Sequence, residues 1–335
     1  MKRTLLKALV LVTLFAVPAL ANEPLPAVPP IPASNTMNAQ KVELGKMLFF
    51  EPRLSSSGIV SCATCHNPSF AFTDRVARAL GHNHQVGPRN TPTVLNAAFL
   101  SSQFWDGRAA DLETQALGPI QATVEMNESL ERAVSKLNAI PEYKKMFTEV
   151  FGGKEAVNSG NIAKAIAAFE RTLITPNSPF DRYLMGDREA ISADAQKGWE
   201  LFQKKGCNGC HSGPNFSNGY FFRIVVPGST DLGRYEVTKK EEDKYKFRVQ
   251  TLRNIALTYP YFNNGSVERL PDAVKIMSRE MLGAEATDSE AAEARRDRVD
   301  GPVAQLHQQR RADQRHQHAG DPMGDARPEL HAGAR

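Results

Sequence analysis

Apolar residues recur at roughly helical spacing in five stretches of the chain, with polar residues between them. The first pattern begins at Asn38 and places apolar side chains at Val42, Leu44, Leu48 and Phe49. This period is typical of amphipathic helices that bury one face. Helices are therefore expected from Asn38, at about 130–150, at 159–173, after the potential N-cap Ser192, and at 270–282.

The segments between these stretches have no regular period. Residues 70–114 are punctuated by Gly, Pro and Asn, and residues 22–36 contain five Pro. The Pro-rich segment predicts an extended arm that either packs on another part of the protein or forms a mobile leader. Long irregular loops inside a compact domain are usually functional, so we look for a site within 70–114. The expected fold is mainly α, with long loops and few strands.

Two matching motifs, Cys62-Ala63-Thr64-Cys65-His66 and Cys207-Asn208-Gly209-Cys210-His211, use all four cysteines of the chain. A Cys-x-x-Cys-His sequence is typical of covalent c-type haem attachment, with the thiols bonded to the porphyrin and the His as proximal iron ligand. The alternatives are a redox dithiol, a zinc site or a structural disulfide. A redox dithiol needs no following His, and zinc favours cysteine pairs close in sequence or further ligands. Two covalent haems are therefore predicted.

A short internal repeat precedes both motifs. Gly-x-x-Leu-Phe occurs at 45–49 and again at 198–202, each time in an expected helix. The repeat predicts two cytochrome c-like haem domains built on one plan, and residues 177–187, with a Pro and a Gly, are the expected boundary. We assign 1–21 to a signal peptide, 22–180 to the first haem domain, 181–286 to the second, and 287–335 to an atypical tail.

The first 21 residues have the form of an export signal. Lys2, Arg3 and Lys7 precede an apolar run that ends at the small-residue site Ala19-Leu20-Ala21. The run is too short for a bilayer span, which predicts cleavage, a periplasmic protein and no stable membrane anchor. The chain has a formal net charge of +4, which falls to +1 without this segment. Near-neutrality argues against a nucleic-acid partner.

The last residues differ in composition from the rest. From Arg295 onward the chain has no Lys and no aromatic residue, and it holds four of the eight His. A disordered tail and a reading-frame change in the sequence both explain this composition, and the latter is favoured by the abrupt loss of Lys.

The second axial ligand of each haem decides whether its iron only carries electrons or binds an oxidant. For the second haem, Met277 and Met281 are candidates in the helix expected at 270–282. For the first haem the candidates are His82 and His84, because no other His lies between the two motifs. A solvated loop His and a core Met remain the alternative interpretations.

Two further residues carry possible chemistry. Trp105 is interpreted as a hydrophobic anchor, with electron conduction between the haems as the alternative. Glu125 is flanked by apolar residues, and burial near iron would raise its pKa and suit it to proton transfer. A simply solvated glutamate is the alternative.

The chain from about 41 to 283 resembles the bacterial di-haem cytochrome c peroxidases. The resemblance is carried by both haem motifs, Gly81-His82, Gly87-Pro88-Arg89-Asn90-Thr91-Pro92-Thr93, Gln103-Phe104-Trp105-Asp106-Gly107-Arg108, Gly118-Pro119-Ile120-Gln121, Val124-Glu125-Met126, and Tyr259-Pro260-Tyr261-Phe262.

The resemblance implies a role for each matching position. His66 and a displaceable His82 would be the ligands of the peroxide-reacting haem, and His211 and Met277 those of the electron-accepting haem. Gln115 and Glu125 would line the peroxide pocket, with Glu125 as acid/base, and Trp105 would lie between the haems. One calcium ion would bind the Asn90 side chain and the carbonyls of Thr258 and Pro260, which are hard oxygen donors.

The expected function is reduction of hydrogen peroxide to water with electrons from a small cytochrome c or a cupredoxin, in a protein whose relatives are commonly dimers. Two alternatives stay open, a di-haem electron carrier and a related oxidase that modifies a partner protein and has Tyr in place of Met277. Two departures from the family pattern stand out. Asn263 occupies a position where the family usually has His, and the tail replaces the expected closing helix.

Overall fold

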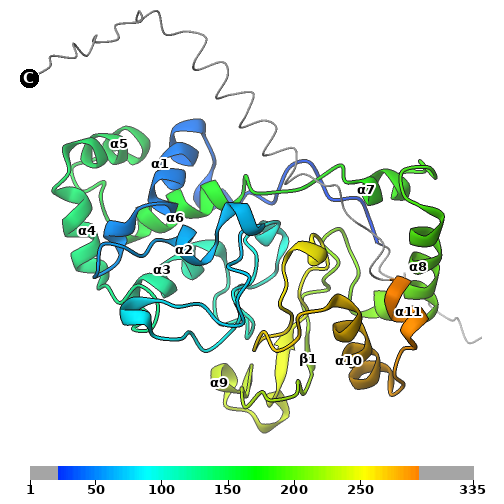
Figure 1. Cartoon of the computed structure of the whole chain (residues 1–335). Helices are drawn as coiled ribbons and strands as arrows, with labels where there is room; N and C mark the ends of the chain where they lie inside the picture. The colour runs from blue at the N-terminus through cyan, green and yellow to red at the C-terminus, as the bar shows by residue number, and fades with distance from the viewer. Residues whose placement is uncertain (1–21, 294–335) are drawn as a thin grey trace, which may run out of the picture.

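The computed structural model describes residues 22–293, which form a mainly helical fold with long loops (Figure 1). Two short antiparallel strands, β1 (Phe221–Arg223) and β2 (Lys246–Arg248), pair with Phe222 opposite Phe247. The mainly α fold with few strands is therefore confirmed, whereas the predicted signal segment 1–21 and residues 294–335 lie outside the described part. The α-helices are α1 (Ala39–Phe49), α2 (Cys62–Cys65), α3 (Leu112–Gln121), α4 (Leu130–Asn138), α5 (Pro141–Phe151), α6 (Ser159–Glu170), α7 (Pro179–Leu184), α8 (Ala193–Lys204), α9 (Tyr235–Thr238), α10 (Leu270–Leu282) and α11 (Asp288–Glu293).

The helices gather in two groups with the irregular loops between them (Figure 1). In the N-terminal group, α1 and α3 to α6 pack around one hydrophobic core. Each of these helices contributes a fully buried side chain, and their packing follows from the apolar stripes on their facing sides. These side chains are Leu48, Ile120, Leu137, Phe147 and Ile166.

Helices α1 and α6 cross closely at Gly45, the first residue of the repeated Gly-x-x-Leu-Phe sequence. A Cβ atom at Gly45 would lie 1.8 Å from the carbonyl oxygen of Ala165, so only glycine fits there. Phe49, one turn later, packs edge to face on Phe169 of α6 with ring centroids 5.3 Å apart. The repeat thus has a packing function in its first copy.

The C-terminal group, α8, α10 and α11, is built around aromatic rings. Trp199 and Phe202, both from the second copy of the repeat on α8, stack on each other, and Trp199 also contacts Phe180 and Phe216. Helix α11 lies against α8 and pairs Glu290 with Lys205 at 2.8 Å. Helix α11 falls in the range that was assigned to the tail, so the regular structure continues beyond residue 286.

Two expectations about element boundaries need correction. The helix predicted at about 130–150 is two helices, α4 and α5, because Pro141 starts a new helix after Ile140 and cannot continue the previous one. The boundary expected at 177–187 contains the short helix α7, which begins at the capping residue Ser178. Asp181 of α7 is fully buried and ion-paired with Arg253 at 2.7 Å.

The Pro-rich arm packs against both groups of helices. Leu25 is buried, and its backbone N–H donates to Asp181 at 2.9 Å. The side chain of Asn22 donates to the carbonyl of His211, whereas that of Asn35 reaches Glu113 of α3. Of the two interpretations of this segment, the packed arm is the one observed.

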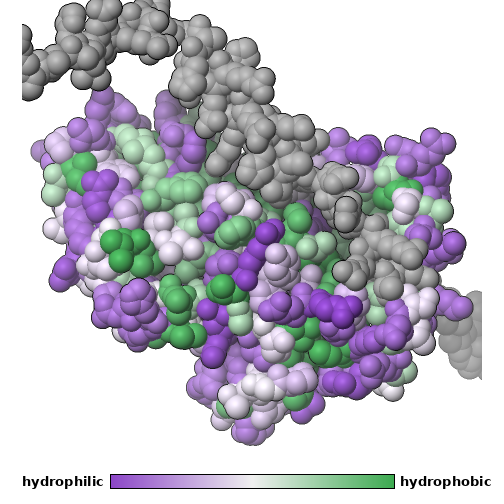
Figure 2. All heavy atoms as spheres, viewed as in Figure 1, coloured by the Kyte–Doolittle hydropathy of each residue, from purple (hydrophilic) through white to green (hydrophobic). Residues whose placement is uncertain are grey.

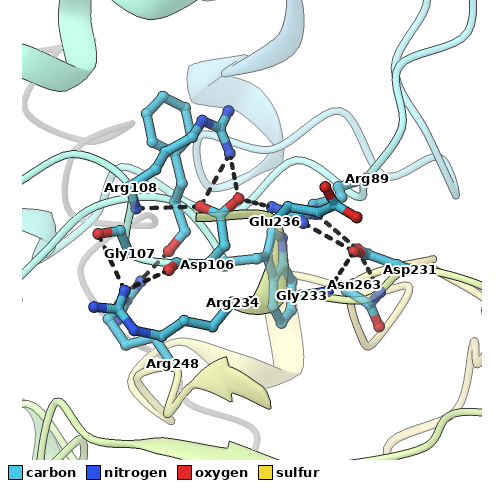
Figure 3. A network of polar contacts seen from close by, with 12 residues as sticks. Arg89, Asp106, Gly107, Arg108, Asp231, Gly233, Arg234, Glu236, Arg248 and Asn263 are labelled. Atoms are coloured by element: carbon cyan, nitrogen blue, oxygen red, sulfur yellow. Dashed lines mark hydrogen bonds and ion pairs between the residues drawn. The ribbon is translucent and has the colours of Figure 1, made fainter. Parts of the chain in front are cut away.

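A buried ionic network joins loops of the N-terminal half to the C-terminal half (Figure 3). Arg89 makes two hydrogen bonds to Asp231, at 2.6 and 2.9 Å, and bonds Asp106 on its other side. At Asn263, the position at which the chain departs from its expected family, the side-chain nitrogen donates to Asp231 at 3.0 Å and the backbone carbonyl accepts from the backbone N–H of Asn90 at 2.7 Å. The side-chain amide of Asn263 therefore takes part in the contact between the two halves of the molecule.

The exterior is mixed in character. On the face shown in Figure 2, hydrophobic residues form small groups separated by hydrophilic ones. Within residues 22–293, every helix falls short of the length and hydrophobicity that a membrane-spanning helix requires.

Candidate functional site

The first Cys-x-x-Cys-His motif folds as the single helical turn α2. Ser61 and Thr64 form a capping box at its start, and the backbone N–H of His66 closes it on the carbonyl of Cys62 at 2.9 Å. Positions three apart in a helical turn share one face. The turn therefore presents Cys62 and Cys65 on one side, with His66 directly after them.

Both motif histidines have the same hydrogen bond. Nδ1 of His66 lies 3.2 Å from the carbonyl oxygen of Phe72, and Nδ1 of His211 lies 3.0 Å from that of Phe216. Because a carbonyl only accepts, each Nδ1 is the protonated nitrogen and the lone pair is on Nε2. Burial lowers the pKa of both imidazoles, which keeps them neutral. A neutral imidazole oriented in this way is the form that ligates iron.

The four cysteines are free thiols, so the predicted alternative of a structural disulfide finds no support. Burial raises the pKa of Cys62 and of Cys65 to about 12, and it also raises those of Cys207 and Cys210. Redox dithiols work as thiolates and have lowered pKa values. The raised pKa values of these thiols thus argue against a redox dithiol. Within 22–293, no group of three or more His, Cys, Asp or Glu side chains lies in an arrangement that could hold a metal ion.

The first motif lines a pocket that opens to solvent. The walls combine the motif with side chains of α3, α6 and the loop after α3. The polar side chains that line it are Ser61, Cys62, Cys65, His66, Gln115, Glu125 and Glu170.

Gln115 and Glu125, predicted from the resemblance, therefore lie in the same cavity as the first motif. Gln115 projects from α3, which begins at the N-cap Asp111. Glu125 lies in the turn after α3, and its backbone N–H donates to the carbonyl of Ala122 at 2.9 Å. Burial raises the pKa of Glu125, and the nearby charge of Arg108 partly opposes this. A half-buried carboxyl group with a raised pKa is suited to accept and return a proton.

His82 is the first residue of the short 3-10 helix η4 (His82–His84), in a loop closed by the bond from Gly87 N–H to the carbonyl of Ala79. Its backbone N–H donates to the carbonyl of Glu125 at 2.7 Å. A Cβ atom at Gly81 would lie 2.1 Å from the carbonyl oxygen of Val124, so the close approach of the two segments requires glycine. His82 does not line the cavity, but its backbone is hydrogen-bonded to Glu125, which does.

The ring of His82 is oriented by Ser56. The Ser56 hydroxyl donates to the carbonyl of Met126 and lies 3.1 Å from Nδ1 of His82. This contact orients the ring through Nδ1 and leaves Nε2 outside it. His84 is exposed. Of the two histidines, His82 is thus the one prepared to act as a ligand.

The second motif follows the end of α8, and its first three residues form the 3-10 helix η6 (Cys207–Gly209). Gly206, at φ 79°, allows the turn between the two helices. Met277 and Met281 are both half-buried on α10. No described contact joins either methionine to His211. The predicted pair of His211 with Met277 therefore remains a prediction.

Trp105 lies where the two halves meet. Its indole N–H donates to the carbonyl of Asn90 at 2.9 Å, and its own carbonyl accepts from Arg248 of β2 at 2.9 Å. The side chain is anchored by a hydrogen bond as well as by packing. The amide nitrogen of Asn90 donates to the carbonyl of Val76 at 3.0 Å, so this side chain is held by its nitrogen while its oxygen is available. The bond from Asn90 N–H to Asn263 brings Asn90 next to the segment of Thr258 and Pro260.

Two residues near the first motif have no counterpart among the predicted ones. Ser56 orients His82, and Glu170 at the end of α6 lines the cavity with only 5% of its surface exposed. A signal for Glu170 was present, since this glutamate continues the apolar face of α6 one turn after Ile166. The signal is weak because a glutamate at a helix end is most often exposed.

Comparison with known proteins agrees with this geometry. A family model described as di-haem cytochrome c peroxidase matches residues 39–189. The chain is 46% identical over 282 residues to the cytochrome c551 peroxidase of Pseudomonas aeruginosa, covering 81% of this chain and 79% of that protein. It is 43% identical over 244 residues to the methylamine utilization protein MauG of Methylorubrum extorquens, covering 72% and 69% of the two chains.

Solved structures show the same architecture. A MauG-like protein associated with microbial copper homeostasis superposes with a TM-score of 0.69 at 28% identity, covering 83% of this chain and 87% of that one. The diheme peroxidase BthA of Burkholderia thailandensis superposes with a TM-score of 0.67 at 20% identity, covering 77% of this chain and 85% of that one. This second likeness concerns the fold alone.

Proposed function

This chain belongs to the di-haem cytochrome c peroxidase family, and from that premise we propose that it reduces hydrogen peroxide to water with electrons from a small cytochrome c or a cupredoxin. Relatives named as cytochrome c peroxidases are between 32% and 46% identical to it. The observation that carries the proposal is the cavity in which Gln115 and Glu125 face the first haem motif.

Each side chain of the cavity has a role in this proposal. Cys62 and Cys65 attach the first haem, and His66 offers Nε2 to its iron. When bound, the haem supplies the redox chemistry, by which two electrons and two protons convert hydrogen peroxide to two waters. Glu125 takes a proton from one peroxide oxygen and returns it to the other. General acid–base catalysis of this kind raises a reaction rate by about 10²–10⁴-fold. Gln115 orients the peroxide by hydrogen bonding.

His82 is proposed as the displaceable ligand on the other side of the first haem. Its ring is oriented through Nδ1 by Ser56, and its loop contains Asn83 and His84 at φ 51° and 59°, a conformation that costs residues other than glycine some energy. Its backbone hydrogen bond to Glu125 couples any movement of this loop to the acid/base.

The second motif completes the proposal as the electron-accepting site, with Cys207 and Cys210 attached to haem and His211 and Met277 as ligands. Each group of helices is then one cytochrome c-like haem domain, 22–180 and 181–286, with Trp105 at their joint. The export signal predicted at 1–21 places the protein in the periplasm. A homodimer is proposed from the family resemblance.

A calcium ion is proposed at the joint as well. The donors are the side-chain oxygen of Asn90 and the carbonyls of Thr258 and Pro260, a set of hard oxygen ligands. The hydrogen bonds that fix the Asn90 amide nitrogen support this assignment, since they direct the oxygen away from Val76.

The related oxidase activity, in which Tyr replaces Met277, is a second candidate because two relatives of 39% and 43% identity are named MauG. Tyrosines near position 277 in sequence are Tyr259 and Tyr261. The hydroxyl of Tyr261 lies 3.2 Å from the carbonyl oxygen of Ile255, to which it donates, so this tyrosine is already engaged. This observation favours the peroxidase.

A spectroscopic redox titration followed by a peroxide assay tests the proposal. We expect two covalent haems of unequal potential, a change of ligation at the first haem on half-reduction, and turnover of peroxide with a reduced small cytochrome c. Two equivalent six-coordinate haems that ignore peroxide would identify the protein as an electron carrier instead. Oxidation of a partner protein with no peroxidase turnover would favour the oxidase.

A further inference from the structure

Glu170 is a buried carboxyl group for which the proposed reaction has so far no role. It ends α6, and it lines the cavity together with Cys62, Gln115 and Glu125. Only 5% of its surface is exposed, and its oxygen Oε2 has no hydrogen-bond partner. Leaving a buried polar atom unpaired costs stability, so such an atom at a cofactor cavity indicates a partner in the loaded protein.

The cations near Glu170 do not neutralise it. Arg171, the next residue, is turned to Glu113 of α3 and bonds both of its carboxylate oxygens, at 2.7 and 3.0 Å. Burial therefore raises the pKa of Glu170 to about 8, with the charge of Arg171 lowering it and that of Glu113 raising it. On the cavity side, the other groups that can titrate are Glu125, His66 and the two thiols of the motif.

We propose that Glu170 is held as a neutral carboxylic acid, presents its proton to the cavity that holds the first haem, and makes the reduction potential of that haem depend on pH. The inference rests on the proposed attachment of a haem at Cys62 and Cys65, and it goes beyond the proposed function in naming a second protonatable group. Glu170 acts through the haem environment, so it is a positioning residue and not a catalytic one.

The direction of the effect follows from charge. Reduction of the haem adds an electron, which is opposed by a nearby carboxylate but not by a neutral acid. At pH values below the pKa of Glu170, the reduction potential of the first haem does not change with pH. At higher pH the reduction potential falls, because Glu170 ionises in the oxidised protein. The limiting slope for one proton and one electron is about 59 mV for each tenfold change in proton concentration.

The test is spectroelectrochemistry of the first haem in the purified di-haem protein, from about pH 6 to about pH 10, which brackets the pKa. In the unmodified protein we expect a level potential that falls above about pH 8. Glu170→Gln keeps the size and polarity of the side chain but cannot ionise, so its potential should stay level throughout. An identical fall in both proteins, or no fall in either, would overturn the proposal.

Two controls separate this group from others. Glu125→Gln removes the other carboxyl of the cavity and should retain the fall, whereas Glu128→Gln changes a buried glutamate that pairs with Lys136 away from the cavity and should also retain it. Infrared difference spectra should show the carbonyl band of a protonated carboxylic acid that is absent only in Glu170→Gln. Absence of this band from the unmodified protein below pH 8 would contradict a neutral Glu170.

Failure of the proposal for Glu170 can be distinguished from failure of the proposed function. A protein without covalent haem, or without peroxide turnover, refutes the function. A protein that binds two haems and turns over peroxide, yet shows no change with Glu170→Gln in potential or infrared band, refutes only the role of Glu170.

Discussion

At the scale of single residues, the chemistry of the first site depends on where protons are held. Nδ1 of His66 donates to a carbonyl, so the lone pair of that ring is on Nε2, and burial lowers the pKa of the ring. Glu125 is the opposite case, a carboxyl whose pKa is raised by burial. The site thus combines the neutral imidazole of His66 with a carboxyl group that can exchange its proton.

Glu125→Gln should therefore remove turnover and leave both haems in place. The amide keeps the shape of the side chain but can neither accept nor return a proton, so we expect a loss of about 10²–10⁴-fold in kcat. Absorption spectra of both haems should remain nearly those of the unmodified protein. Activity equal to that of the unmodified protein would show that another group is the acid/base.

Arg108→Gln should move the pH dependence of the same reaction. Burial raises the pKa of Glu125 and the positive charge of Arg108 opposes this, so removal of the charge should raise the pKa further. Because catalysis requires the ionised carboxylate, the acid limb of kcat/KM should move to higher pH. Arg132→Gln, an exposed arginine that pairs with Glu128, is the control and should not move it. A shift to lower pH in Arg108→Gln would contradict the assignment.

At the scale of elements, the crossing of α1 and α6 brings the walls of the cavity together. Glu170 and Ile166 of α6 line the cavity only because α6 lies across α1 at Gly45. The motif turn α2 follows α1 after residues 50–61, and Cys62 packs against the core that the two helices share. A change at Gly45 should thus affect stability and site together.

Gly45→Ala should lower the free energy of unfolding by about 1–3 kcal/mol, because the new methyl group would enter the space of the Ala165 carbonyl and push the helices apart. Thermal or denaturant unfolding measures the loss. Gly160→Ala, near the start of α6, is the matched control, since a Cβ atom there would lie 3.4 Å from its nearest neighbour, Asn158 Oδ1. Equal stability of the two variants would mean that the helices can separate without cost.

At the scale of the whole molecule, buried ionic contacts hold the two halves in one arrangement. Arg89 joins Asp106 to Asp231 (Figure 3). Elsewhere, Asp181 pairs with Arg253 and also accepts from the backbone N–H of Leu25 in the arm. Trp105 and Asn90 lie in the same joint. A protein that passes electrons between two sites needs such a fixed geometry.

Arg89→Leu should weaken this joint strongly. The buried Asp106 and the half-buried Asp231 would lose their shared cation, and breaking such a pair costs up to about 3–5 kcal/mol. We expect a lower unfolding temperature and faster proteolysis between the two halves. Arg182→Leu, which removes a surface pair with Asp187 at 3.8 Å, should cost less than about 1 kcal/mol. If the two variants unfold alike, the network does not hold the halves together.

The sequence alone determined the features that depend on local spacing. Two Cys-x-x-Cys-His motifs specify their chemistry within five residues, and the helical period of 39–49 and 270–282 is encoded in neighbours three and four apart. The tertiary structure decided what depends on which faces meet. Glu170 is more than a hundred residues from Cys62 in the chain, Ser56 is 26 from His82, and Asn22 is 189 from His211. No local sequence pattern encodes contacts between residues so far apart in the chain, because these contacts are selected by packing of the whole fold and by the burial of charges in pairs.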